Sequence, residues 1–163
     1  MSELEKVGYC DRSTDLTGWL VRPEGKPRGA LVLFPTIVNV NAALERRALM
    51  LAQAGFVVMI ADFYGEPVGS FEASQPLAAQ LREDVNHYRM RLAAAVAALR
   101  SLDCSKGLRL GAIGYCMGGQ AVLELARNGE DLALVASFHG ILETGRRATS
   151  DSGIHPRLLI CHG

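Results

Sequence analysis

A cysteine inside a glycine-rich turn is the residue of this sequence best placed to do covalent chemistry. The turn reads Gly-Tyr-Cys-Met-Gly-Gly over residues 114–119, and its third residue is Cys116. An apolar run precedes the turn at 108–113, and a helix-forming stretch follows at 120–127. A strand, a sharp turn with a nucleophile at its apex and a helix together make a nucleophile elbow, in which serine is the usual residue. The pattern therefore predicts a thiol nucleophile at Cys116.

The residues around the sulfur suit that chemistry. Gly114 and Gly118 leave room in a crowded turn, and Gly119 lets the helix pack close to the strand. Unpaired N–H groups and the positive end of the helix dipole face the sulfur, and both favour the thiolate, which is the attacking form. The backbone N–H of Met117 is one expected donor of an oxyanion hole. The alternative is a structural cysteine, since a free cysteine is often a small core residue.

Two nucleotide-binding motifs fit this segment poorly. Its glycines lack the G-x-G-x-x-G spacing of a dinucleotide site, and no lysine follows Gly119 as a P-loop would require. The histidines of the chain have no metal-ligand spacing, so no metal is expected.

Length and composition narrow the class of protein. A chain of 163 residues with zero net charge predicts one domain, 1–163, and no nucleic-acid partner. No apolar run approaches the roughly 20 residues of a membrane span, and the polar first six residues do not form a signal peptide. The cysteines show no paired spacing, which is typical of reduced thiols in a cytoplasmic protein; they are Cys10, Cys104, Cys116 and Cys161.

The elements that must hold the turn alternate between strand and helix patterns along the whole chain. This alternation predicts an α/β fold whose sheet is mostly parallel and has helices on both faces. The predicted strands are 17–22, 30–34, 56–61, 108–113, 132–138 and 157–161. The predicted helices are 42–54, 79–102 and 120–127, with Asn41 and Gly55 capping the first, and the predicted loops are 62–78 and 143–156.

Five segments give the chain a resemblance to the dienelactone hydrolase family of α/β-hydrolases. They are Leu-Val-Leu-Phe-Pro at 31–35, Ala-Asp-Phe-Tyr-Gly at 61–65, the turn at 114–119, Ser-Phe-His-Gly at 137–140 and Leu-Leu-Ile-Cys-His-Gly at 158–163. The resemblance implies the α/β-hydrolase fold and a cysteine nucleophile that works with an Asp and a His. It also implies a carboxylic ester hydrolase, similar to carboxymethylenebutenolidases, which opens lactones or cleaves activated esters of small molecules without a cofactor.

The resemblance also assigns roles to individual residues. The nucleophile is Cys116, and the second oxyanion donor is the backbone N–H of Ile37, beside the N–H of Met117. Thr36 stands where well-known members have a Glu that holds the resting thiol, so activation by substrate through that Glu is not expected here. Family members bind a substrate carboxylate with Arg. The candidate substrate-binding residues are Arg82, Arg89, Arg91, Tyr115 and His139.

The order of catalytic residues in α/β-hydrolases is nucleophile, acid, then histidine. The resemblance places the acid and the histidine beyond Gly163, together with a final strand and helix, so we expect a C-terminally truncated domain of poor activity. We also expect an open sheet edge, which favours self-association. The alternatives within the chain are His139 and His162, which follow strand ends, and the acids Asp62 and Glu143. Asp62 is more simply a residue that caps a turn.

Two other functions fit the same pattern. One is a non-catalytic binding module on the same fold, whose partner or second copy pairs with the open sheet edge. The other is an enzyme that cleaves thioesters or peptides. Specificity depends on pocket shape and loops, so the sequence does not separate these from an esterase.

Overall fold

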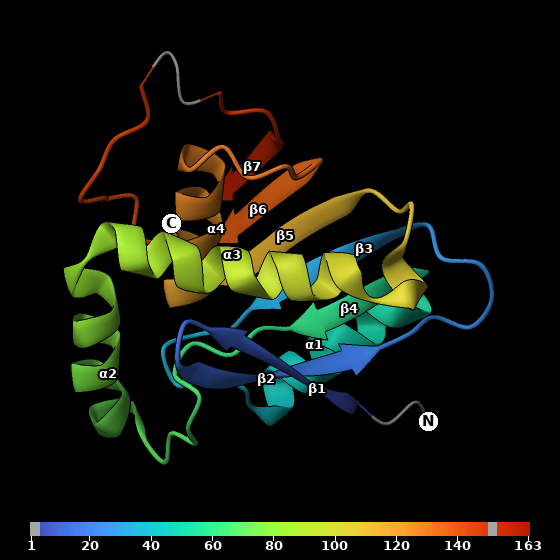
Figure 1. Cartoon of the computed structure of the whole chain (residues 1–163), viewed down its shortest axis with the longest axis horizontal. Helices are drawn as coiled ribbons and strands as arrows, with labels where there is room; N and C mark the ends of the chain where they lie inside the picture. The colour runs from blue at the N-terminus through green and yellow to red at the C-terminus, as the bar shows by residue number, and fades with distance from the viewer. Residues whose placement is uncertain (1–3, 150–152) are drawn as a thin grey trace.

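A seven-stranded sheet runs through the centre of the computed structural model, which describes residues 4–149 and 153–163 (Figure 1). The strands lie in the order β1-β2-β4-β3-β5-β6-β7. β1 and β2 are antiparallel to their neighbours, and the other five strands are parallel. The strands are β1 (Glu5–Asp11), β2 (Thr14–Val21), β3 (Gly29–Phe34), β4 (Phe56–Ile60), β5 (Leu110–Tyr115), β6 (Leu134–Phe138) and β7 (Arg157–Cys161). The mostly parallel sheet predicted from the sequence is confirmed.

Helices cover both faces of this sheet, as predicted. They are α1 (Ala42–Gln53), α2 (Phe71–Glu83), α3 (Val85–Ser101) and α4 (Met117–Arg127). α1 packs on one face, and α3 and α4 pack on the other (Figure 1). The sheet has a hydrophobic core on each face, and alternate residues of β3 belong to one or the other. Val32 and Phe34 face α3 and α4, whereas Leu31 and Leu33 face α1. Burial on two sides explains the continuous apolar sequence of this strand.

The N-cap of α1 is Asn41, as predicted, whereas the C-cap is Ala54 and the predicted cap Gly55 is the next residue. The side chain of Asn41 accepts the backbone N–H of Leu44, which satisfies one of the unpaired donors of the first turn. Gly55 has a φ of 97° and follows the last residues of the helix. This left-handed conformation favours glycine, so the chain can turn there and enter β4.

The segment between β4 and β5 corrects the predicted elements. The predicted loop 62–78 is wrong in its second half, where α2 begins after Ser70, and the predicted helix 79–102 is two helices. The helices separate at Asp84, whose carboxylate accepts two backbone N–H groups of the first turn of α3. A side chain that competes for backbone N–H groups favours a new helix start over a continuous helix.

The first strand, β1, is a second correction, because the sequence analysis predicts no strand before residue 17. β1 pairs with β2 over its whole length, and the hairpin turns at Arg12, which has a φ of 55°. Its residues are mostly half-exposed or exposed, as expected of an edge strand.

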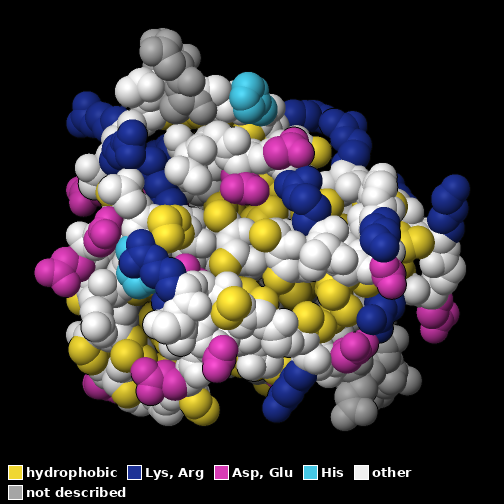
Figure 2. Space-filling view, in the orientation of Figure 1, with side chains coloured by type: hydrophobic (Ala, Val, Ile, Leu, Met, Phe, Trp, Pro, Cys, Tyr) yellow, Lys and Arg dark blue, Asp and Glu magenta, His cyan; other side chains and the backbone are white. Residues whose placement is uncertain are grey.

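The surface and the last predicted loop add two observations. Basic and acidic side chains are interspersed on the face of the molecule that Figure 2 shows, with apolar surface between them. The described residues of the predicted loop 143–156 contain no helix or strand, and 150–152 lie outside the described residues. Within the described part of the chain, every helix is too short or too polar to cross a bilayer.

Candidate active site

Cys116 lies at the carboxyl end of β5, in the sharp turn that leads into α4. Its backbone has a φ of 55° and a ψ of −115°, a region that residues with a side chain rarely adopt. The backbone N–H of Cys116 donates to the carbonyl oxygen of Phe138 at 3.0 Å, which ties the turn to the end of β6. The residue is exposed. The predicted strand–turn–helix geometry is confirmed.

Close backbone contacts explain the glycines of the turn. A Cβ atom on Gly114 would lie 1.9 Å from the carbonyl oxygen of Gly118, and one on Gly118 would lie 2.2 Å from that of Phe34. A Cβ on Gly119 would lie 2.8 Å from the Cα of Gly140. α4 therefore begins against the ends of β3 and β6, and only glycine fits at these contacts.

The two expected oxyanion donors belong to neighbouring elements at this edge of the sheet. Met117 is the first residue of α4, where backbone N–H groups have no partner within the helix. Ile37 lies in the loop after β3 and is partly buried against the core beneath α3 and α4. The phenol of Tyr64 contacts both elements: its O–H donates to the Ile37 carbonyl at 2.9 Å and lies 3.5 Å from the Met117 sulfur.

The loop that carries Ile37 has a second anchor at Asp62. One Asp62 carboxylate oxygen accepts the side-chain amide of Asn39 at 2.8 Å and the backbone N–H groups of Tyr64 and Gly65 at 3.0 Å. The other accepts the backbone N–H of Thr17 at 3.0 Å. The interpretation of Asp62 as a turn-capping residue is thus confirmed.

The three candidate arginines have different surroundings. Arg89 and Arg91 are buried, and their guanidinium groups bind Glu124 and Asp11, each at 2.7 Å. Arg82 is half-buried; it donates to the Ala78 carbonyl and, at 3.3 Å, to the side chain of Gln120 on α4. Within residues 4–149 and 153–163, no carboxylate pairs with Arg82. Arg82 is therefore the candidate left free for an anionic ligand.

Tyr115 and His139 are the other candidate substrate-binding residues. The Tyr115 ring stacks on Phe138 with centroids 5.2 Å apart, and the guanidinium carbon of Arg47 lies 4.5 Å from its centroid. Tyr115 is partly buried and packs against the core on the α1 face of the sheet. His139 follows β6, is exposed and has a φ of 57°. Its backbone N–H donates to the carbonyl oxygen of Cys161.

The polar groups near the turn differ in whether they have hydrogen-bond partners. In the part of the chain that the structure describes, no histidine or carboxylate is hydrogen-bonded to the Cys116 sulfur. Burial raises the pKa of Tyr64 to about 12, so its phenol keeps the proton that it donates. Burial also raises the pKa of Tyr88, whose hydroxyl has no hydrogen-bond partner among the described residues.

Sequence reasoning missed Tyr64, Gln120 and Asn39 as neighbours of the site. Tyr64 lies in the segment 61–65, which directly follows a predicted central strand. A polar residue in that position lies at the carboxyl edge of the sheet, where ligands bind in open α/β folds. That placement was the available signal for Tyr64, whereas no spacing in the sequence indicates that Gln120 meets Arg82.

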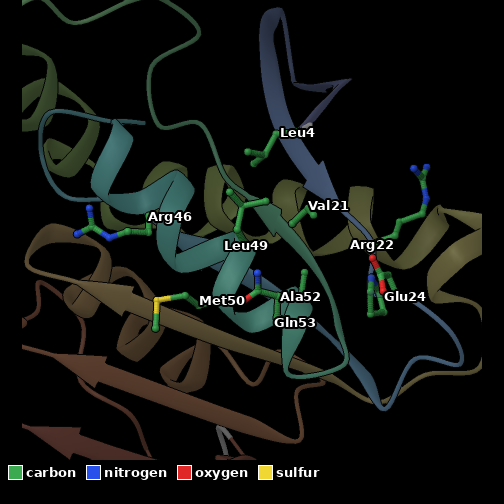
Figure 3. A pocket seen from close by; sticks show the side chains of 10 residues that line it. Leu4, Val21, Arg22, Glu24, Arg46, Leu49, Met50, Ala52 and Gln53 are labelled. Carbon is green, nitrogen blue, oxygen red and sulfur yellow. The ribbon is translucent and has the colours of Figure 1, made fainter. Parts of the chain in front are cut away.

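The cavities that described residues form include two that border the sheet. One of about 1010 Å³ lies between α1 and the end of β2, on the α1 face (Figure 3). Its lining includes Val21, Leu49 and Met50 but none of the predicted site residues. A smaller cavity of about 260 Å³ borders Tyr64, His87 and Arg91. Neither lining includes Cys116, which follows the carboxyl end of the internal strand β5.

Comparison with known proteins gives a consistent result. The sequence model of the dienelactone hydrolase family matches residues 16–162. A curated relative from Bradyrhizobium sp., named "Probable 2-oxo-3-(5-oxofuran-2-ylidene)propanoate lactonase", is 30% identical over 142 residues, which are 85% of this chain and 56% of the relative. The chain thus spans little more than half the length of that relative.

Two solved structures share most of the fold. One, named m3DLH, is 31% identical with a TM-score of 0.86, and the match covers 98% of this chain and 68% of that one. The other is a dienelactone hydrolase-like promiscuous phosphotriesterase from metagenomic libraries, 32% identical with a TM-score of 0.87, over 98% of this chain and 67% of that one.

Proposed function

The chain belongs to the dienelactone hydrolase family, and we propose that it is a hydrolase that opens lactones or cleaves activated esters through Cys116. The observation that carries this proposal is the backbone of Cys116, held at a φ of 55° between β5 and α4. A strained conformation at an exposed thiol costs stability without improving packing. An exposed nucleophile on a sharp turn explains that cost.

The proposed reaction has two steps. The Cys116 thiolate attacks the carbonyl carbon, and the carbonyl electron pair moves onto the oxygen, which accepts the N–H groups of Met117 and Ile37. Return of that pair breaks the C–O bond, and the departing oxygen takes a proton, which leaves a thioester on Cys116. Water then attacks the thioester, releases a carboxylic acid and restores the thiol. In a lactone the departing oxygen stays on the same molecule, so the product is a hydroxy acid or its keto form.

We propose that Arg82 selects substrates that carry a carboxylate. Its guanidinium is half-buried near Gln120, one turn after Cys116 on α4, and has no carboxylate partner among the described residues. An arginine fork matches a carboxylate in geometry and charge. The relative from Bradyrhizobium is named for a lactone with a propanoate group, which supports an anionic substrate class.

We propose that acylation of Cys116 outpaces release of the acid, so that turnover of the 163-residue chain is poor. His139 is exposed at the same edge of the sheet, but no hydrogen bond joins a described histidine to the sulfur. Loss of a base costs several orders of magnitude in related triads, while oxyanion stabilisation remains. A first acylation needs only the thiolate and the oxyanion donors.

The test is the time course of 4-nitrophenolate release from 4-nitrophenyl acetate. We expect a burst of about one equivalent that is lost in Cys116→Ala and kept in Cys161→Ala, which removes another exposed thiol. A burst that survives Cys116→Ala would overturn the proposal. Rapid turnover that depends on Cys116 would contradict the expectation of poor activity and identify a histidine of this chain as the base.

A binding module on the same fold is a second candidate, and one observation favours it. All five residues of β7 are exposed. Alkylation of Cys116 as a function of pH separates the two functions, because an enzyme nucleophile titrates below the value of about 8.5 found for free cysteine. An inert Cys116, together with a dimer that depends on concentration, would favour the binding module.

A further inference from the structure

We infer that Tyr64 is a positioning residue that holds the two expected oxyanion donors at a fixed separation. This inference rests on the proposed function and adds to it a side chain that has no hydrogen bond to the Cys116 sulfur. Tyr64 lies in the loop after β4, the strand that pairs with β3. Its ring is buried beside Phe63, with centroids 5.9 Å apart.

The phenol connects the loop after β3 to the start of α4. Its O–H donates to the carbonyl oxygen of Ile37 at 2.9 Å, and its oxygen lies 3.5 Å from the sulfur of Met117. These are the two residues whose backbone N–H groups are expected to hold the oxyanion. Within the described residues, no other side chain hydrogen-bonds to both of them.

The backbone of Tyr64 is fixed independently of its ring. Its N–H donates to the same Asp62 carboxylate oxygen that accepts the side-chain amide of Asn39, two residues after Ile37. The loop is therefore restrained at two points: by the phenol at the Ile37 carbonyl, and by Asp62 at Asn39. Because its backbone is fixed, the Tyr64 phenol can hold the Ile37 loop and the start of α4 at a constant distance from each other.

The restraint matters because oxyanion donors act only over a narrow range of positions. A donor must lie roughly 2.7–3.1 Å from the place that the oxyanion will occupy. Fixing the Ile37 carbonyl limits rotation about the backbone of Ile37 and therefore the direction of its N–H. A misplacement of about 1 Å can cost 100-fold in rate. Because burial keeps the phenol protonated, the donor is present at neutral pH.

Two reagents that react with the same sulfur test this role. Iodoacetamide forms an S–C bond as iodide leaves, and no oxyanion develops. 4-Nitrophenyl acetate forms a tetrahedral oxyanion before nitrophenolate leaves, so its reaction depends on the donors. The ratio of the acylation rate to the alkylation rate at Cys116 therefore reports donor position. Partial unfolding or a changed thiolate fraction would change both rates.

We expect Tyr64→Phe to lower the acylation rate about tenfold or more and to leave the alkylation rate within about twofold. Met117→Leu removes the sulfur contact and keeps the backbone N–H, so it should give a smaller loss of the same kind. The matched control is Tyr88→Phe, since the Tyr88 hydroxyl is buried without a hydrogen-bond partner among the described residues. It should leave the ratio unchanged.

The outcomes separate this inference from the proposed function. If wild-type acylation is no faster than that of a free thiol of equal alkylation rate, both are overturned. If wild-type acylation is fast and Tyr64→Phe leaves the ratio unchanged, the positioning role alone is overturned. An equal fall in both rates for Tyr64→Phe and Met117→Leu also overturns it, because the contacts would then support the fold rather than the donors.

Discussion

The carboxylate of Glu124 lies 2.7 Å from the guanidinium of Arg89, and both side chains are almost completely buried between α4 and α3. Removing Arg89 leaves the buried Glu124 carboxylate with Arg127, at 2.9 Å, as its remaining ion-pair partner among the described residues. We expect Arg89→Ala to lower the free energy of unfolding by about 3 kcal/mol, measured by urea denaturation. The control is Arg22→Ala, whose pair with Glu5 is half-exposed and should contribute less than about 1 kcal/mol. Equal losses would show that burial does not matter here.

Arg82 should affect binding rather than stability. We expect Arg82→Met to raise the KM, or the half-saturating concentration in the burst, about 10- to 100-fold for an activated ester that carries a carboxylate. The value for a neutral ester such as 4-nitrophenyl acetate should stay unchanged, and so should the unfolding curve. Arg100→Met is a suitable comparison, because Arg100 pairs with Asp131 near the far end of α3. A uniform change for both esters would contradict a carboxylate site.

The glycines of the turn should tolerate no side chain. In Gly118→Ala the new Cβ would lie 2.2 Å from the Phe34 carbonyl oxygen and 2.5 Å from that of Pro35, so α4 must move away from β3. We expect Gly118→Ala to be severely destabilised or insoluble. Gly8→Ala is the control, because a Cβ there meets nothing within 4 Å. The measurement is the melting temperature of each variant compared with the unchanged chain. A Gly118→Ala variant as stable as Gly8→Ala would contradict the close packing.

The raised pKa of Tyr64 predicts a loss of stability at high pH. The value is about 12 in the folded chain and about 10 in an unfolded one, so the folded state favours the protonated phenol. The contribution is fully present below about pH 10 and is lost as the pH rises towards about 12. Tyr64→Phe should therefore lose stability less steeply between pH 10 and 11.5 in urea titrations. Part of the slope should remain, because burial also raises the pKa of Tyr9 and Tyr88.

The outer edge of β7 predicts association with a second copy of the chain. Leu158, Leu159 and Ile160 are each about half-exposed, at 46%, 48% and 47%. An antiparallel pair of two such strands centred on Leu159 would put Arg157 opposite Cys161, so no like charges would meet. We expect a dimer whose fraction rises with concentration in analytical ultracentrifugation. Leu159→Lys should weaken it, and a dimer unaffected by that change would have another interface.

The sequence was sufficient to predict structure where a pattern is compatible with a single local structure. The apolar run of β3 and the glycines around Cys116 predict a buried strand and a sharp turn, because few other structures accommodate them. The cap at Asn41 was also predictable, since its side chain bonds within its own first turn. These features depend on neighbours in the sequence or on burial alone.

Other features depend on contacts that the sequence does not encode locally. Pro76 and its glycine- and serine-rich surroundings favour a loop, yet Pro76 lies inside α2. β1 has weak alternation because it is a half-exposed edge strand. The candidate site shows the same limit, since Arg82, Arg89 and Arg91 share one stretch of sequence, and their partners Gln120, Glu124 and Asp11 lie 35 or more residues away.

The β1–β2 hairpin supports the loop that carries Ile37, although the two lie far apart in the sequence. The Tyr9 hydroxyl accepts the backbone N–H of Asp62 at 2.9 Å, and the Asp62 carboxylate holds Asn39 in the loop that carries Ile37. Shortening the protein from its front should therefore show a threshold. Variants that begin before β1 should keep the loop rigid. Variants that begin after Tyr9 lack its hydroxyl and should make the loop more mobile.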